Sequence, residues 1–259
     1  MIAGASTSCF YPLETEKALD LIGRAWFRKA EVFFNAACEL EEPFIAELNA
    51  IRRRYGMEIV SIHPYSSFME TQCIFGDYER RFHDILPLYE RYFEVCAELG
   101  GKYVVLHGAL KKTKMPIPDE RYFERFNYLA DLAKKHGVVL AQENVNLFKS
   151  ESIDFLKRMR EAVRGNFKLV FDVKQAIRAG QDVFEFVNTF SSDICHVHLS
   201  DNTPEKDCLP PGRGTFDIKQ LKSKLLMGGY TGDYIIEIYS PGFDVERELV
   251  RSRIFLEGI

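Results

Sequence analysis

The chain has 259 residues, of which 46% are hydrophobic, 13% aromatic and 28% charged. This composition provides enough apolar material for a sizeable core and excludes an intrinsically disordered chain. The formal net charge of -4 gives no basic field of the kind that binds a phosphate backbone, so we expect no nucleic acid partner.

The six cysteines show no C-x-x-C pair, and several lie within apolar runs, where a cysteine acts as a small hydrophobic residue. We therefore expect reduced thiols and a cytoplasmic protein. The N-terminal sequence MIAGASTSCFYPLE lacks the charged and apolar segments of a signal peptide, and no stretch is long enough to span a membrane. We expect neither secretion nor a membrane partner.

Short apolar runs predict eight β-strands along the chain. In order they are 2–9, 30–35, 57–64, 102–109, 138–145, 167–173, 194–201 and 233–240. Apolar residues at helical spacing predict a helix between each strand and the next, and a last one after the eighth strand. These helices are 15–28, 44–55, 86–99, 122–137, 152–163, 182–190, 217–227 and 244–256.

Eight alternating strand and helix units predict a (β/α)₈ TIM barrel, an α/β fold, as a single domain over residues 1–259. A doubly wound open sheet is the main alternative. Such a sheet is expected to carry a glycine-rich turn after its first strand, and SCFYPLE is not one. The strand-to-helix connections 65–77, 110–118 and 201–214 are unusually long, and all would emerge at the C-terminal face, where TIM barrels have their active sites.

Acidic and histidine side chains stand at the C-terminal ends of the last four predicted strands. They are Glu143, Asp172, His198 and Glu237. Their strands are otherwise apolar, and an unpaired buried carboxylate is costly, which favours a bound cation. Carboxylate and imidazole ligands suit Mn²⁺, Co²⁺, Mg²⁺ or Zn²⁺, so we predict a divalent metal ion here. Taken singly, each acid is also explained as a helix cap or a salt-bridge partner.

Two histidines in the segment HVHLSDN lie two residues apart and face the same side of the seventh strand. His198 is nearer the strand end and is predicted to be a metal ligand. His196 is predicted to pack inside the barrel with a hydrogen bond. His63 and His107 end the third and fourth strands, and we assign them to substrate contact, although either could also ligate metal. Arg213, in the turn G-R-G, is assigned to a substrate oxygen or to a salt bridge at the rim.

The sequence resembles the xylose isomerase-like TIM barrel superfamily, which includes sugar isomerases and epimerases and the endonuclease IV class of repair enzymes. The pieces that carry the resemblance are SIHPY (61–65), VLHGA (105–109), QENVN (142–146), FDVKQA (171–176), HVHLSDN (196–202), LPPGRGTFD (209–217) and IIEIY (235–239). The resemblance implies one divalent metal ion, held by Glu143, Asp172, His198 and Glu237. It also implies a homodimer or a homotetramer.

The sequence departs from parts of this family at three positions. The histidine that epimerase relatives use to contact substrate is replaced by Gln175, which we assign to the same substrate-binding position. The repair nucleases hold three zinc ions, and Gln175, Lys206 and Cys208 stand where those enzymes carry metal ligands. A trinuclear site would therefore lack three ligands.

We hypothesise a metal-dependent isomerase or epimerase that acts on a small sugar, a sugar phosphate or a keto-polyol. Glu143 and Glu237 would act as base and acid, one removing a proton from the substrate carbon and the other returning it through a cis-enediolate. Three alternatives remain open. They are a metal-dependent keto-inositol dehydratase with the same ligands, an endonuclease IV-like AP endonuclease, and a non-catalytic metabolite-binding barrel.

Overall fold

The computed structural model of the chain describes residues 3–114, 116–163, 165–239 and 243–259. Eight parallel strands close into a barrel in the order β1-β10-β7-β6-β5-β4-β3-β2, and β1 pairs with β2 to complete the ring. The strands are β1 (Ala3–Ser6), β2 (Lys29–Phe33), β3 (Glu58–His63), β4 (Tyr103–Leu106), β5 (Val139–Glu143), β6 (Leu169–Asp172), β7 (Ile194–Leu199) and β10 (Tyr234–Ile236).

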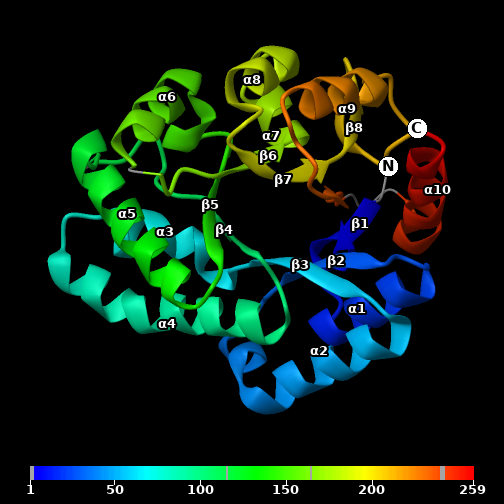
Figure 1. The fold of residues 1–259 in the computed structure, drawn as a ribbon, viewed down its shortest axis with the longest axis horizontal. Coiled ribbons are helices and arrows are strands. Elements are labelled where there is room, and N and C mark those ends of the chain that lie inside the picture. Colours follow the sequence, from blue (N-terminus) through cyan, green and yellow to red (C-terminus); the bar gives the residue numbers. More distant parts are fainter. Residues whose placement is uncertain (1–2, 115, 164, 240–242) are drawn as a thin grey trace.

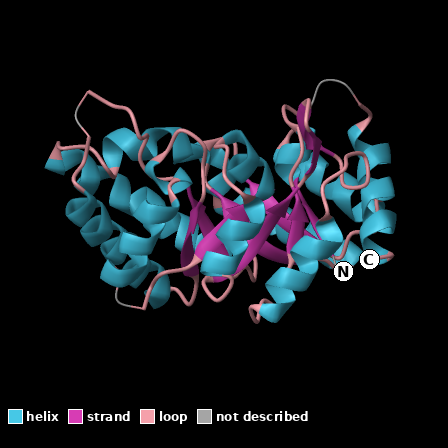
Figure 2. Ribbon diagram, turned by 90° about the horizontal axis from the view of Figure 1, so that it is seen from above, coloured by secondary structure: helices cyan, strands magenta, loops and turns pink. Residues whose placement is uncertain are grey.

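Helices surround the strands (Figures 1 and 2). The longer ones are α1 (Thr15–Arg24), α2 (Glu42–Tyr55), α4 (Glu79–Glu98), α5 (Asp119–Lys135), α6 (Ile153–Ala162), α8 (Val183–Phe190), α9 (Ile218–Met227) and α10 (Val245–Glu257). The predicted TIM barrel is therefore confirmed. Within the described residues, no helix combines the length and the apolar character that crossing a membrane requires. All six cysteines are free thiols.

The interior of the barrel is lined according to the two-residue period of its strands. Val105, Ala141 and Val170 form a small apolar cluster that is separate from the main core. The last two lie two residues before Glu143 and Asp172 at the ends of the same strands. Because alternate side chains point to the same face of a strand, these carboxylates also point into the barrel, one layer nearer its mouth.

One helix begins about two turns before its predicted start. The helix expected at 86–99 is α4, which starts at Glu79 and contains Pro87. Proline is common in the first turn of a helix, which is why the sequence indicates a start near residue 86. Phe82 and Ile85 extend the buried apolar face of the helix by more than a turn before the proline. Their burial accounts for the longer helix.

Two of the predicted long connections contain structure of their own. The 65–77 connection folds into a 3₁₀ helix (Tyr65–Met69) and α3 (Glu70–Cys73). The 201–214 connection contains an antiparallel hairpin of β8 (Asp201–Thr203) and β9 (Lys206–Leu209). Elements of three to five residues are too short to show a hydrophobic period, so the sequence does not indicate them.

The turn G-R-G is built around the buried carboxylate of Asp201. That carboxylate accepts hydrogen bonds from the backbone N–H groups of Gly212, Gly214 and Phe216. A Cβ on Gly214 would lie 2.3 Å from the Asn202 carbonyl oxygen and from Asp201 Oδ1, so the turn requires glycine there. The motif therefore holds the connection after β7 against the barrel.

A glycine two residues after β4 offers a test of how closely α5 packs against the barrel. Gly108 has φ +93°, and a Cβ there would lie 2.0 Å from the Oη of buried Tyr122. We expect Gly108→Ala to lower the free energy of unfolding by about 2–4 kcal/mol, because backbone strain and overpacking act together.

The matched control is Gly100→Ala, which has φ +77° but no atom within 4 Å of the added Cβ. Backbone strain alone should cost this variant about 1–2 kcal/mol. Urea unfolding of both variants measures the difference. Equal losses would contradict the close approach of Tyr122 to Gly108.

Candidate metal centre

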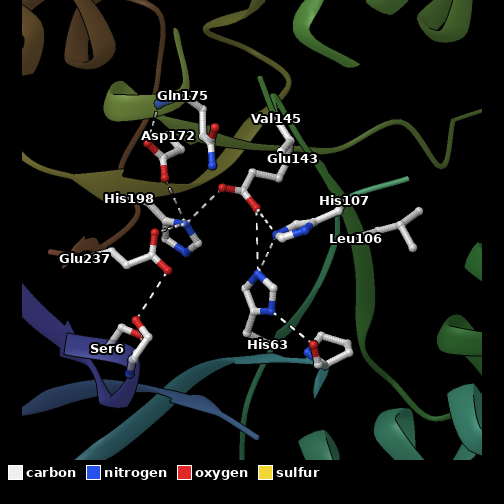
Figure 3. Close-up of polar contacts among 12 residues, drawn as sticks. Ser6, His63, Leu106, His107, Glu143, Val145, Asp172, Gln175, His198 and Glu237 are labelled. Carbon is white, nitrogen blue, oxygen red and sulfur yellow. Dashed lines mark hydrogen bonds and ion pairs between the residues drawn. The ribbon is translucent and has the colours of Figure 1, made fainter. Parts of the chain in front are cut away.

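Four side chains from consecutive strand ends meet at the C-terminal mouth of the barrel (Figure 3). One ligand atom from each of Glu143, Asp172, His198 and Glu237 lies within 4.8 Å of the corresponding atom of the other three. All four residues are buried, and Glu237 is the most exposed of them at 6%. The structure therefore brings together all four predicted metal ligands.

Glu143 lies between His198 on one side and the pair His63 and His107 on the other (Figure 3). Its Oε2 is 3.0 Å from His107 Nε2 and 3.7 Å from His63 Nε2, while its Oε1 is 3.5 Å from His198 Nδ1. Burial alone would raise the pKa of Glu143, but the charge and hydrogen bond of His107 lower it well below its usual value. The group is therefore a carboxylate, as a metal ligand or a general base must be.

Asp172 is held by the start of the short helix α7 (Val173–Arg178). Its Oδ1 caps the helix by accepting the N–H of Gln175 at 2.9 Å, which leaves Oδ2 to face the cluster. Asn144, next to Glu143, pairs with the backbone N–H and carbonyl of Asp172 at 2.7 and 3.0 Å. This side chain therefore fixes the ends of β5 and β6 relative to each other.

His198 is oriented by a carboxylate that lies deeper in the barrel. Glu31 of β2 is fully buried, and its Oε2 lies 2.9 Å from His198 Nε2. A carboxylate only accepts hydrogen bonds, so Nε2 carries the proton and donates it. Nδ1 then faces the cluster, 3.6 Å from Glu237 and 3.9 Å from Asp172. A carboxylate behind a histidine is the usual support of a metal-ligating imidazole.

The same Glu31 oxygen organises a layer of polar side chains below the cluster. Ser61 Oγ donates to it at 2.7 Å, and His196 Nε2 lies 3.3 Å away. His196 is fully buried and also contacts Ser61 at 3.0 Å. The structure therefore places His196 in the barrel interior with hydrogen bonds, where the sequence predicts it.

The charges of the cluster favour an additional cation. Burial raises the pKa of Asp172 to about 7 despite the opposing charge of Lys174. Burial alone would lower the pKa of His198, but the charges of Glu31 and Glu237 raise it well above its usual value. Both shifts mean that positive charge, as a proton or an ion, is stabilised at this place.

A cavity of about 410 Å³ opens beside the cluster. This volume lies in the range of roughly 300–1,000 Å³ that small-molecule sites occupy. Its lining residues are Ser8, Tyr11, Phe33, Asn35, His63, His107, Glu143, Lys174, Gln175, Glu237 and Tyr239. Both glutamates of the cluster are among them, whereas Asp172 and His198 are not.

The residues assigned to substrate contact fall in two places. His63, His107 and Gln175 line the cavity, and the Nε2 atoms of the two histidines are 2.9 Å apart. Arg213 forms a bidentate ion pair with Glu248 of α10, with distances of 2.6 and 2.7 Å, and is not among the cavity residues.

Two buried residues of this site are missed by the sequence reasoning. Glu31 is the only charged residue of the predicted strand 30–35. A single acid among the apolar residues of a strand was the available signal. Lys174 is 1% exposed, and its Nζ lies 2.7 Å from Glu237 Oε2 and 2.9 Å from Asp172 Oδ2. A lysine two residues after the aspartate of the sixth strand offered no comparable pattern.

The cluster has the chemistry of a divalent metal site. It offers one imidazole nitrogen and three carboxylates, which suits hard to borderline divalent ions. His198 Nδ1 is buried and has no hydrogen-bond partner, while Glu143 Oε2 and Asp172 Oδ2 are buried and have only ion-pair contacts, with His107 and Lys174. A cation bound between them would satisfy polar atoms that are otherwise costly to bury. The residues therefore fit the ion that the sequence predicts.

Comparisons with known proteins identify the family and the fold. The sequence model of the xylose isomerase-like TIM barrel family matches residues 25–257. An uncharacterised protein of Mycobacterium leprae is 24% identical over 91% of this chain and 88% of its own length. A putative hydroxypyruvate isomerase of Streptomyces coelicolor is 28% identical over 49% of this chain and 47% of its own. Inosose dehydratase of Mesomycoplasma hyopneumoniae strain 7448 is 26% identical over 60% of this chain and 53% of its own.

Two solved structures have the same fold. The 3-keto-D-glucoside 4-epimerase YcjR of E. coli, in its apo form, superposes with a TM-score of 0.79 at 19% identity and covers the whole of both chains. The IOLI protein with a bound zinc atom superposes with a TM-score of 0.78 at 18% identity and covers 99% of this chain and 96% of its own.

The support that Glu31 gives to His198 can be tested by an isosteric change. We expect Glu31→Gln to weaken Mn²⁺ binding about tenfold, because the amide removes the charge behind His198 and cannot accept from all three of its donors. Calorimetric titration of the metal-depleted protein measures the affinity.

Glu39→Gln is the control, since Glu39 is another buried glutamate whose carboxylate accepts from Thr15 and Asn35, away from the cluster. It should keep the wild-type affinity. An unchanged affinity in Glu31→Gln would mean that Glu31 does not orient the ligand.

Proposed function

We propose, since the chain belongs to the xylose isomerase-like TIM barrel family, that it is a divalent-metal-dependent isomerase or epimerase of a small sugar, sugar phosphate or keto-polyol. The metal would be held by Glu143, Asp172, His198 and Glu237. The two glutamates would also be the acid and base that move a proton at a substrate carbon.

One observation carries this proposal: the two glutamates line the cavity, and Asp172 and His198 do not. An ion among the four side chains would touch both a fixed pair of ligands and a pair that faces a bound substrate. A purely structural metal site is closed by its ligands, whereas a catalytic site keeps a side open. The cavity beside Glu143 and Glu237 supports an open site here, with an ion that takes more than the four protein ligands.

A divalent ion bound at this place supplies Lewis acidity, which polarises a substrate carbonyl and acidifies the neighbouring C–H. Glu143 and Glu237 approach from opposite sides of the cluster, on β5 and after β10. The carboxylate of one removes the proton, and the other returns it, through a cis-enediolate of the substrate. Burial alone would raise the pKa of Glu237, but Lys174 and His198 lower it to about 2, so this group also starts as a carboxylate. Whichever glutamate returns the proton must therefore first take one up from water in the cavity.

The wall of the cavity beside Glu143 would bind the hydroxyl groups of the substrate. His63 is stacked on Phe33 at 4.4 Å between ring centroids and contacts His107, so both imidazoles are held in place. His107 has 21% of its side chain exposed, which leaves it accessible from the cavity. Gln175 would contribute its side-chain amide. Arg213 stays a predicted substrate contact, which would require release of its pair with Glu248.

The identity of the ion is part of the proposal. Zinc is supported by the IOLI protein, which shares this fold and binds a zinc atom. Three carboxylates and one imidazole are equally compatible with Mn²⁺, Co²⁺ or Mg²⁺.

A keto-inositol dehydratase is the second candidate, and the relative named inosose dehydratase favours it. The same two carboxylates would then remove a proton and assist the departure of a hydroxyl group. A product lighter than its substrate by one water distinguishes dehydration from isomerisation.

Replacing either cavity-facing glutamate should stop proton transfer. On a substrate identified by screening sugars and keto-polyols, we expect Glu143→Gln and Glu237→Gln to reduce turnover by about 100-fold or more. Incorporation of deuterium from heavy water into the substrate carbon, followed by NMR, measures the step itself.

The control Glu185→Gln, at an exposed glutamate of α8 that does not line the cavity, should exchange and turn over at the wild-type rate. Circular dichroism should show that both active-site variants stay folded. Near wild-type exchange in Glu143→Gln would contradict the two-glutamate mechanism.

A further inference from the structure

Lys174 brings a permanent positive charge into the predicted metal site. It is the second residue of α7 and is 1% exposed, which is rare for a lysine unless it is paired. Its Nζ donates a hydrogen bond to Glu237 Oε2 at 2.7 Å and forms an ion pair with Asp172 Oδ2 at 2.9 Å. The ammonium group therefore bridges two of the four predicted ligands, which come from different strands.

The ammonium uses the same two oxygen atoms that a metal ion would need. Asp172 Oδ1 is occupied by the N–H of Gln175, and Glu237 Oε1 accepts from Ser8 Oγ at 3.4 Å. The remaining oxygens, Asp172 Oδ2 and Glu237 Oε2, are those nearest to His198 Nδ1. Both are in contact with Lys174.

We propose that Lys174 is an internal cation that competes with the divalent ion for Asp172 and Glu237. In the ion-free protein the ammonium holds the two carboxylates together. Metal binding then displaces it, because two like charges on the same pair of oxygens repel each other. This inference rests on the metal site of the proposed function, but its test does not depend on turnover.

The ammonium has a further contact that does not involve the predicted ligands. Its Nζ lies 4.6 Å from the centroid of the Tyr239 ring, within the range of a cation–π contact. Lys174 and Tyr239 both line the cavity, and the lysine side chain has four rotatable carbon–carbon bonds. The side chain can therefore rotate away from the two carboxylates while its ammonium keeps the Tyr239 ring as a partner at the cavity wall.

Mn²⁺ titration of a charge-removing variant tests the competition. We expect Lys174→Met to bind Mn²⁺ about tenfold tighter than the wild type at the same pH, because no ammonium has to leave. Lys149→Met is the matched control. It removes another largely buried lysine, but Lys149 pairs with Asp119 and touches neither predicted ligand. Its affinity should stay within about twofold of the wild type.

The outcomes separate the inference from the proposed function. Equal or weaker Mn²⁺ binding by Lys174→Met, beside a wild type that binds, overturns the competition and leaves the metal site intact. Absence of binding to the wild type and to every variant overturns both.

A measurement on the wild-type protein avoids dependence on the folding of the variant. In crystals grown with Mn²⁺, anomalous scattering should locate the ion among the four ligands, with Nζ moved beyond hydrogen-bond distance of Asp172 and Glu237. An ion at this place with both lysine contacts retained would overturn the proposal. Lys174→Gln, which keeps a polar head group, serves as the second variant if Lys174→Met is unstable.

Discussion

The site is governed by the cost of burying four carboxylates at one mouth of a barrel. Glu31, Glu143, Asp172 and Glu237 are all at most 6% exposed. An isolated buried carboxylate is expensive, so each one needs a positive partner or several hydrogen-bond donors. Lys174 is the permanent cation that contacts two of them, and histidines, serine hydroxyls and one backbone N–H supply the remaining donors. A divalent ion would complete this compensation.

The architecture explains why the carboxylates are together. Parallel strands in a closed barrel bring their C-terminal ends to one face, and the two-residue period stacks the inward side chains in layers. The upper layer contains the predicted metal ligands and, next to Glu143, the histidines His63 and His107, with Phe33 stacked on His63. The layer below contains Glu31, which reaches His198 from across the barrel. The lower layer therefore orients the predicted ligand His198, while the upper layer carries the ligands that face the cavity.

Much of this arrangement could be predicted from the sequence. The eight strands and their helices follow from hydrophobic periodicity, and Glu143, Asp172, His198 and Glu237 are recognisable because each stands at or just beyond the end of an apolar strand. The last of the predicted strands, 233–240, ends at Ile236, and its residue 240 lies outside the described residues. Position along the strand, rather than residue type, carried the prediction.

The contacts of the site could not be predicted in the same way. Glu31 acts across the barrel, and its partners His196 and His198 are 165 and 167 residues away in the chain. Lys174 lies on a helix of six residues, too short to give a periodic signal. The pair between Arg213 and Glu248 depends on how α10 packs beside the G-R-G turn. Such contacts depend on tertiary structure, and local patterns do not contain them.

Metal stoichiometry is the most direct test of the central claim that the buried carboxylates and His198 form a divalent metal site. Elemental analysis would be performed on the wild type and His198→Ala after incubation with Mn²⁺, Co²⁺ or Zn²⁺ and removal of the excess. The account predicts about one ion per chain in the wild type and its loss in the variant. No retained ion in the wild type, or the same content in both proteins, would contradict it.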